Sequence, residues 1–198
     1  MALVTNKVEL RRHARHLRKQ THSESGQEAS RRVVDFGLAG VADIWGATPP
    51  GVIAGYLAVG SELDALPLMT GLQQQGWSLA LPVVTAPDTP LTFRHWRKGD
   101  SVEAGSFGIS EPEAEAAEVR PDVVLAPLLA FDDDGYRLGQ GGGFYDRTLA
   151  RWQAEGHTVT VLGLAFGAQR VATVPRDEYD QRLAGIITEN GWRRFGGA

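Results

Sequence analysis

The sequence predicts a single-domain α/β protein, residues 1–198, with a mostly parallel sheet covered by helices on both faces. Its 198 residues, 42% of them hydrophobic, suffice for one core. An apolar run at 51–59 precedes a helical segment at 61–76 and a second apolar run at 77–84. This strand–helix–strand order favours a parallel pair, because parallel strands need a long crossover connection. Two further runs, 122–131 and 158–166, are apolar on both faces, as interior strands are.

Two helices are expected before the first strand. Asn6, with Glu9 three positions later, has the pattern of a helix N-cap. The helix that follows, within residues 1–20, repeats basic side chains at helical spacing. A second start signal, Thr21 with a glutamate three positions on, predicts a new helix that continues towards Ile44.

The remaining elements are assigned from the same patterns. The helical segment at 61–76 is expected to begin or break at Pro67. Further strands are expected at 90–96 and 184–191, a turn at 132–135, and a helix at 144–156 that ends at a glycine. Residues 97–121 are polar and rich in turn formers, so an irregular segment is expected there.

Composition excludes several classes of protein. The chain has no cysteine, which rules out disulfides, thiolate catalysis and zinc–sulfur sites. A net charge of −4 gives no basic surface for nucleic acid. No stretch of about 18 apolar residues could cross a membrane, and the N-terminal segment lacks the apolar centre of a secretory signal. A cytoplasmic monomer without a nucleic-acid or membrane partner is expected.

The segment RLGQGGGFYDR, residues 137–147, holds the strongest chemical signal. It precedes a predicted helix and follows a predicted central strand, and ligands of open α/β sheets bind beyond such strand ends. Successive glycine N–H groups can converge on an anion, and the helix N-terminus adds a favourable dipole. The pattern is neither a dinucleotide-binding fingerprint nor a Walker A loop. Phosphate binding is predicted, and a plain glycine loop is the alternative.

Asp146, at the end of this loop, would repel a phosphate unless a cation lay between them. Mg²⁺ is held by one or two carboxylates together with phosphate oxygens. A second carboxylate could come from Asp177, Glu178 or Asp180. Lys7 and Arg11, one helical turn apart, could supply positive charge to the phosphates. The alternatives are a solvated aspartate at the start of a helix and a solvated basic helix face.

Five segments, taken in order, resemble the 5-formyltetrahydrofolate cyclo-ligase family, also called methenyltetrahydrofolate synthetase. The most specific is APLLAFDDDGYRLGQGGGFYDRTL at 126–149. The others are KVELR at 7–11, GYLAVGSELDALPL at 55–68, FGISEP at 107–112 and LAFGAQRVATVPRDEYDQRLAGIIT at 164–188. Together they extend over nearly the whole chain.

The resemblance implies a fold of the sugar-isomerase/CoA-transferase-like group and one particular reaction. In that reaction 5-formyltetrahydrofolate, with or without a polyglutamate tail, and ATP give 5,10-methenyltetrahydrofolate, ADP and phosphate, with Mg²⁺ as cofactor. The open alternatives are a family member that binds reduced folate without turnover, and a sugar-phosphate isomerase-like enzyme on the same scaffold.

The resemblance also implies roles for individual residues. ATP would be bound by Lys7, Arg11, Arg137, Leu138, Gly139, Gln140, Gly141, Gly142, Gly143, Phe144 and Tyr145. The folate would contact Leu57, Glu62, Phe107 and Tyr145, and Mg²⁺ would be held by Asp146 and Asp180. Some members of the family carry Arg or Lys where this chain has Gln140 and Gly142. Compensating charge from Arg137, Arg147 or Arg94 is a hypothesis.

Overall fold

The fold is organised around one seven-stranded sheet. The computed structural model describes residues 6–46 and 50–196. The strands are β1 (Val52–Ala54), β2 (Ser78–Val83), β3 (Thr92–His95), β6 (Val123–Pro127), β9 (Thr160–Leu164), β10 (Gly185–Thr188) and β11 (Gly191–Arg194). They lie in the order β11-β10-β9-β6-β1-β2-β3. The five inner strands pair in parallel, and only the edge strands β3 and β11 are antiparallel. The predicted mostly parallel sheet is confirmed, with β6 at its centre.

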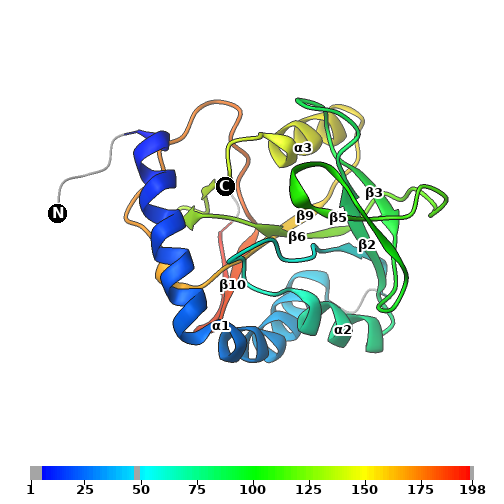
Figure 1. Cartoon of the computed structure of the whole chain (residues 1–198), viewed down its shortest axis with the longest axis horizontal. Helices are drawn as coiled ribbons and strands as arrows, with labels where there is room; N and C mark the ends of the chain where they lie inside the picture. Colours follow the sequence, from blue (N-terminus) through cyan, green and yellow to red (C-terminus); the bar gives the residue numbers. More distant parts are fainter. Residues whose placement is uncertain (1–5, 47–49, 197–198) are drawn as a thin grey trace.

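Helices cover both faces of the sheet, as predicted (Figure 1). The helices α1 (Lys7–Trp45) and α2 (Leu66–Gln74) lie on one face, and α3 (Phe144–Ala154) lies on the other. Neighbouring residues of β6 point to opposite sides, so Leu125 packs in the cluster that contains Leu68 of α2. Val124 packs in the cluster that contains Trp152 of α3. The apolar character of β6 on both faces follows from this double coverage.

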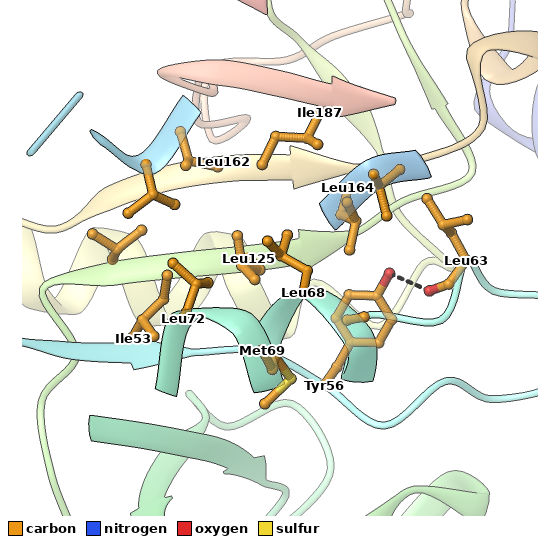
Figure 2. Packing of buried hydrophobic residues seen from close by; sticks show 14 of the residues in the cluster. Ile53, Tyr56, Leu63, Leu68, Met69, Leu72, Leu125, Leu162, Leu164 and Ile187 are labelled. Carbon is orange, nitrogen blue, oxygen red and sulfur yellow. Dashed lines mark hydrogen bonds between the residues drawn. The ribbon is translucent and has the colours of Figure 1, made fainter. Parts of the chain in front are cut away.

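The core beneath α2 also fixes the loop that follows β1. Figure 2 shows Leu68 and Leu72 of α2 next to Leu125 of β6, with Ile53 of the adjacent strand β1 beside Leu72. At the edge of this cluster the buried hydroxyl of Tyr56 donates a 2.8 Å hydrogen bond to the carbonyl of Leu63. This bond closes the loop between the two residues and holds it against the core.

The two predicted N-terminal helices are a single helix, α1, of 39 residues. Asn6 caps it as predicted, because its side chain accepts a hydrogen bond from the backbone N–H of Glu9. Thr21 starts no second helix. Its hydroxyl donates back to the carbonyl of Leu17, and the hydroxyl of Ser25 donates to Thr21 in the same way. Such bonds favour bending, and the ribbon of α1 changes direction along its length (Figure 1).

Several other boundaries differ from the prediction. The segment 97–121 contains a hairpin of β4 (Val102–Ala104) and β5 (Ser110–Pro112), joined through the 3₁₀ turn η1 (Ser106–Gly108). The expected strand 122–131 is divided, because β6 ends at Pro127 and β7 (Ala130–Phe131) pairs with β8 (Arg137–Leu138). The expected strand 51–59 is shortened to β1, and β11 was not expected. A second 3₁₀ turn, η2 (Gly167–Gln169), follows β9. Among the described residues, no helix is long and apolar enough to cross a membrane.

The close approach of α1 to α2 depends on Gly37. A Cβ placed on this residue would lie 2.5 Å from Cδ2 of Leu68, which is fully buried. We therefore expect Gly37→Ala to lower the free energy of unfolding by about 1–3 kcal/mol, as overpacking does. A Cβ at Gly71 of α2 would lie 3.5 Å from its nearest neighbour, so Gly71→Ala should be neutral or stabilising. Denaturant unfolding of both variants tests this, and an equal effect would contradict it.

Candidate active site

One cavity of about 1080 Å³ brings together every residue that the sequence assigns to a site. It opens beyond the carboxyl ends of β1, β2 and β6, where Leu57, Val84 and Pro127 line it. The predicted residues on its wall are Lys7, Arg11, Leu57, Glu62, Phe107, Arg137, Leu138, Gly139, Gln140, Gly141, Gly142, Gly143, Phe144, Tyr145, Asp146 and Asp180. Segments that are far apart in the chain thus form a single site.

The first half of α1 holds the glycine loop, residues 139–143, through the carbonyl groups of the loop. Nε of Arg11 donates to the carbonyl of Gly139 over 3.1 Å. Nη2 of Arg15 donates to the carbonyl of Gln140 over 3.0 Å, and Nε donates to the Gln140 side chain. In a trans peptide the next N–H points away from the carbonyl. The N–H groups of Gln140 and Gly141 therefore point away from these arginines, and no acceptor for them lies among the described residues.

The loop requires glycine in at least one place. Gly141 has a φ of +112°, which side chains rarely adopt. Gly143 has a φ of +65° and immediately precedes the first residue of α3. The loop thus turns sharply into the helix N-terminus, where backbone N–H groups and the helix dipole favour an anion.

We expect Gly141→Ala to lower the free energy of unfolding by about 1 kcal/mol or more, because alanine is strained at this φ. Gly139 provides the matched control. A Cβ there meets no atom within 4 Å, and its φ lies outside the strained range. Thermal unfolding of both variants without ligand tests the assignment, and equal melting temperatures would contradict it.

The two predicted metal ligands lie on neighbouring segments. Asp146, in the first turn of α3, accepts hydrogen bonds from Nη2 of Arg137 at 2.7 Å and from the backbone N–H of Gln181 at 3.4 Å. Gln181 directly follows Asp180, and both aspartates line the cavity. The described residues contain no cluster of three or more His, Cys, Asp or Glu side chains that could hold a metal. Two carboxylates could hold Mg²⁺, which proteins usually bind through one or two carboxylates together with water and phosphate oxygens.

Cations already pair with these acids. Nζ of Lys7 lies 2.6 Å from Asp180 and 2.7 Å from Asp177. Burial opposes the charge of Lys7, but the hydrogen bonds to both aspartates prevail and raise its pKa. The same hydrogen bond from Lys7 lowers the pKa of Asp177. Lys7 thus contacts the acids rather than a free anion site, so phosphate binding by Lys7 would require it to exchange partners.

Another part of the cavity wall contains Glu62, together with Tyr56, Leu57 and Val59. Glu62 is only 9% exposed, and its Oε2 accepts a 3.0 Å hydrogen bond from the backbone N–H of Val59. Burial raises the pKa of the Tyr56 and Tyr145 hydroxyls, and the charge of Glu62 adds to this shift. Both phenols are therefore neutral at physiological pH. The carboxylate of Glu62 is therefore a charged hydrogen-bond acceptor whose tyrosine neighbours in the cavity wall are uncharged.

Phe107 lies at the tip of the β4–β5 hairpin and is 65% exposed. Its φ is +58°, an uncommon value for a bulky residue. Its ring meets that of Phe144 edge to face, with 5.6 Å between centroids. The two rings join the hairpin to the first residue of α3, and both line the cavity.

Sequence reasoning did not assign Arg15 or Arg18 to the site, and it named Arg147 only as a possible source of compensating charge. Arg15 holds Gln140, and Arg18 lies beside Glu62 inside the cavity wall. Arg147 donates to the carbonyl of Gly142 and lies over the ring of Phe144. Helical spacing from Lys7 and Arg11 places Arg15 and Arg18 on the same basic repeat, but this spacing does not distinguish the buried Arg18 from the exposed Arg15.

Of the three residues suggested to compensate for Gln140 and Gly142, two line the cavity. These are Arg137 and Arg147. Arg94 instead contacts the carbonyl of Glu113 and pairs with Glu118 beside β3. The position of Arg94 gives no support to a role near the glycine loop.

The fold and the cavity define an α/β protein with a mostly parallel sheet, whose glycine loop and aspartates lie beyond the carboxyl ends of the strands, where α/β proteins commonly bind small molecules. The family model described as the 5-formyltetrahydrofolate cyclo-ligase family matches residues 4–189. The chain belongs to this family.

Several known proteins can be aligned with most of this chain. A 5-formyltetrahydrofolate cyclo-ligase of Escherichia coli K12 is 32% identical over 188 residues, covering 90% of this chain and 96% of the relative. One from Haemophilus influenzae is 36% identical, covering 68% of this chain and 74% of the relative. The NMR structure of Aquifex aeolicus 5,10-methenyltetrahydrofolate synthetase matches with a TM-score of 0.76 and 29% identity, over 97% of this chain and 94% of that one. The grouping with sugar-isomerase/CoA-transferase-like folds stays a prediction.

Proposed function

We propose that this protein is a ligase that converts 5-formyltetrahydrofolate to 5,10-methenyltetrahydrofolate, with hydrolysis of ATP to ADP and phosphate and with Mg²⁺ as cofactor. Its membership of the cyclo-ligase family supports the folate reaction. The lack of cysteine suits a reducing compartment, and we propose the cytoplasm.

The chemistry explains why a nucleotide would be needed. Ring closure joins N10 of the folate to the formyl carbon, and the formyl oxygen must then leave. As oxide or hydroxide it is a poor leaving group. Transfer of the γ-phosphoryl group to this oxygen forms an iminium phosphate and ADP. N10 then attacks the carbon, phosphate departs, and N10 loses its proton.

The residues divide between two tasks in this scheme. The N–H groups of the glycine loop and the basic residues Lys7 and Arg11 would bind the triphosphate. Asp146 and Asp180 would hold Mg²⁺, which neutralises charge on the phosphates. Glu62 would accept hydrogen bonds from the pterin ring, and Leu57 and Phe107 would contact its apolar faces. Catalysis would then rest mainly on placing the formyl oxygen against the γ-phosphorus.

A single observation carries this proposal: the free N–H groups of the loop, the acidic pair and the buried Glu62 share one cavity. Its volume of about 1080 Å³ slightly exceeds the usual range for one small ligand. Two substrates could therefore lie side by side with their reacting ends in contact.

The direct test follows methenyl absorbance when the protein is mixed with 5-formyltetrahydrofolate and Mg-ATP. We expect absorbance to rise only when all three are present, with one ADP formed per folate. Folate binding without turnover at high protein concentration would instead support a binding protein. Lack of protection against thermal unfolding by Mg-ATP would favour isomerase-like chemistry.

A further inference from the structure

Arg18 is a buried cation in the wall of the cavity. It lies in α1 and is 6% exposed, whereas Arg15 and Lys19 on adjoining turns are exposed. A charged group is rarely buried unless it is paired, because it loses its hydration. The role of Arg18 therefore depends on the groups that it contacts.

Arg18 contacts the loop that carries Glu62. Its Nε donates to the hydroxyl of Ser61 over 3.2 Å, and its Nη1 lies 3.4 Å from Oε1 of Glu62. The second oxygen of Glu62 accepts the N–H of Val59. Each carboxylate oxygen is thus held by one donor and retains a further lone pair for a ligand.

The groups around Glu62 leave Arg18 as its cationic partner. Burial lowers the pKa of Arg18 and the charge of Glu62 opposes this shift, but a guanidinium remains charged in proteins. Tyr56 and Tyr145 face the same site as neutral phenols, and Asp64 accepts the backbone N–H of Leu66. In the part of the chain that the structure describes, no other cation forms an ion pair with Glu62.

We propose that Arg18 is a positioning residue for folate recognition, which holds the carboxylate of Glu62 in the orientation that accepts the N–H donors of the pterin ring. This inference rests on the proposed function. It gives α1 a role at both ends of the cavity. Arg18 follows Lys7 by eleven residues, roughly 16 Å along a helix, so one element would place both the phosphate-binding and the ring-binding groups.

The test measures binding of 5-formyltetrahydrofolate and of its analogue that lacks the 2-amino group, by titration calorimetry without nucleotide. Arg18→Met should weaken binding of 5-formyltetrahydrofolate about tenfold or more, as loss of a charge-assisted contact does. It should also reduce the preference of the protein for the ligand that bears the amino group. Arg18→Lys should recover part of both effects, and Lys19→Met on the exposed side should match the wild type.

Three further results decide the inference. Glu62→Gln should lose the same preference, and Arg18→Met should then add little to it, because both residues act through one contact. The dissociation constant for Mg-ATP should be unchanged in every Arg18 variant. If Arg18→Met fails to fold, Arg18→Lys carries the comparison of the two ligands.

An Arg18 variant that keeps the full preference, or that weakens both folates and Mg-ATP alike, overturns the positioning role. A wild-type protein that does not bind 5-formyltetrahydrofolate overturns the proposed function itself. The two failures are therefore distinguishable.

Discussion

Asp146→Asn is expected to lower kcat/KM for the cyclo-ligase reaction about 100-fold, since even residues behind metal ligands can contribute 10–100-fold. The substitution removes a charge but keeps a side-chain oxygen. This oxygen can still accept the hydrogen bond that Arg137 donates to Asp146 over 2.7 Å in the wild type. Arg137 also keeps the hydrogen bond that it donates to the carbonyl of Gln181. The free energy of unfolding should therefore fall by no more than about 1–2 kcal/mol. Activity should recover in part at high magnesium concentration.

The control for Asp146 is the same chemical change elsewhere. Asp35 lies on the exposed side of α1. Asp35→Asn should leave both the activity and its dependence on magnesium unchanged. Initial rates across a magnesium titration make the comparison. If Asp146→Asn and the wild type give the same curve, Asp146 is not a metal ligand.

Lys7→Ala is expected to raise KM for ATP about tenfold, the contribution of one charge-assisted hydrogen bond, while KM for folate changes little. The pairing of Lys7 with Asp180 leads to a second expectation. The ammonium group competes with a metal for this carboxylate. In the absence of nucleotide, Lys7→Ala should therefore bind a divalent cation more tightly than the wild type.

Lys19→Ala serves as the control for Lys7, because it removes the same charge from an exposed position of the same helix. Steady-state kinetics gives both KM values, and calorimetry with Mg²⁺ or Mn²⁺ gives the affinity for the metal. A larger rise in KM for folate than in KM for ATP would place the start of α1 at the wrong end of the cavity.

The sheet could be predicted because its signals are local. Runs such as 122–131 and 158–166 are apolar on both faces, and only interior strands need that pattern. Boundaries were harder, because tertiary contacts decide them. Thr21 has the sequence of a helix start, yet its hydroxyl donates to the preceding turn and α1 continues over α2 and the sheet.

Residues that line the cavity were predicted where a motif marks them and missed where only packing brings them there. The glycine loop and Asp146 are contiguous in sequence, and family resemblance identified Asp180 and Glu62. In the sequence, Arg18 cannot be distinguished from the exposed basic residues next to it on α1. Its contact with Glu62 spans 44 positions, which no local pattern encodes. The pairing of Lys7 with Asp177 and Asp180 is equally non-local.

We propose that backbone N–H groups of residues 139–143 bind the phosphates of a nucleotide while Asp146 and Asp180 share its metal ion. A crystal structure with ADP, Mg²⁺ and 5-formyltetrahydrofolate tests this most directly. We expect the phosphates at the glycine loop, one ion between the two carboxylates, and the pterin beside Glu62. Nucleotide bound away from the loop, or an ion that neither aspartate contacts, would contradict the account.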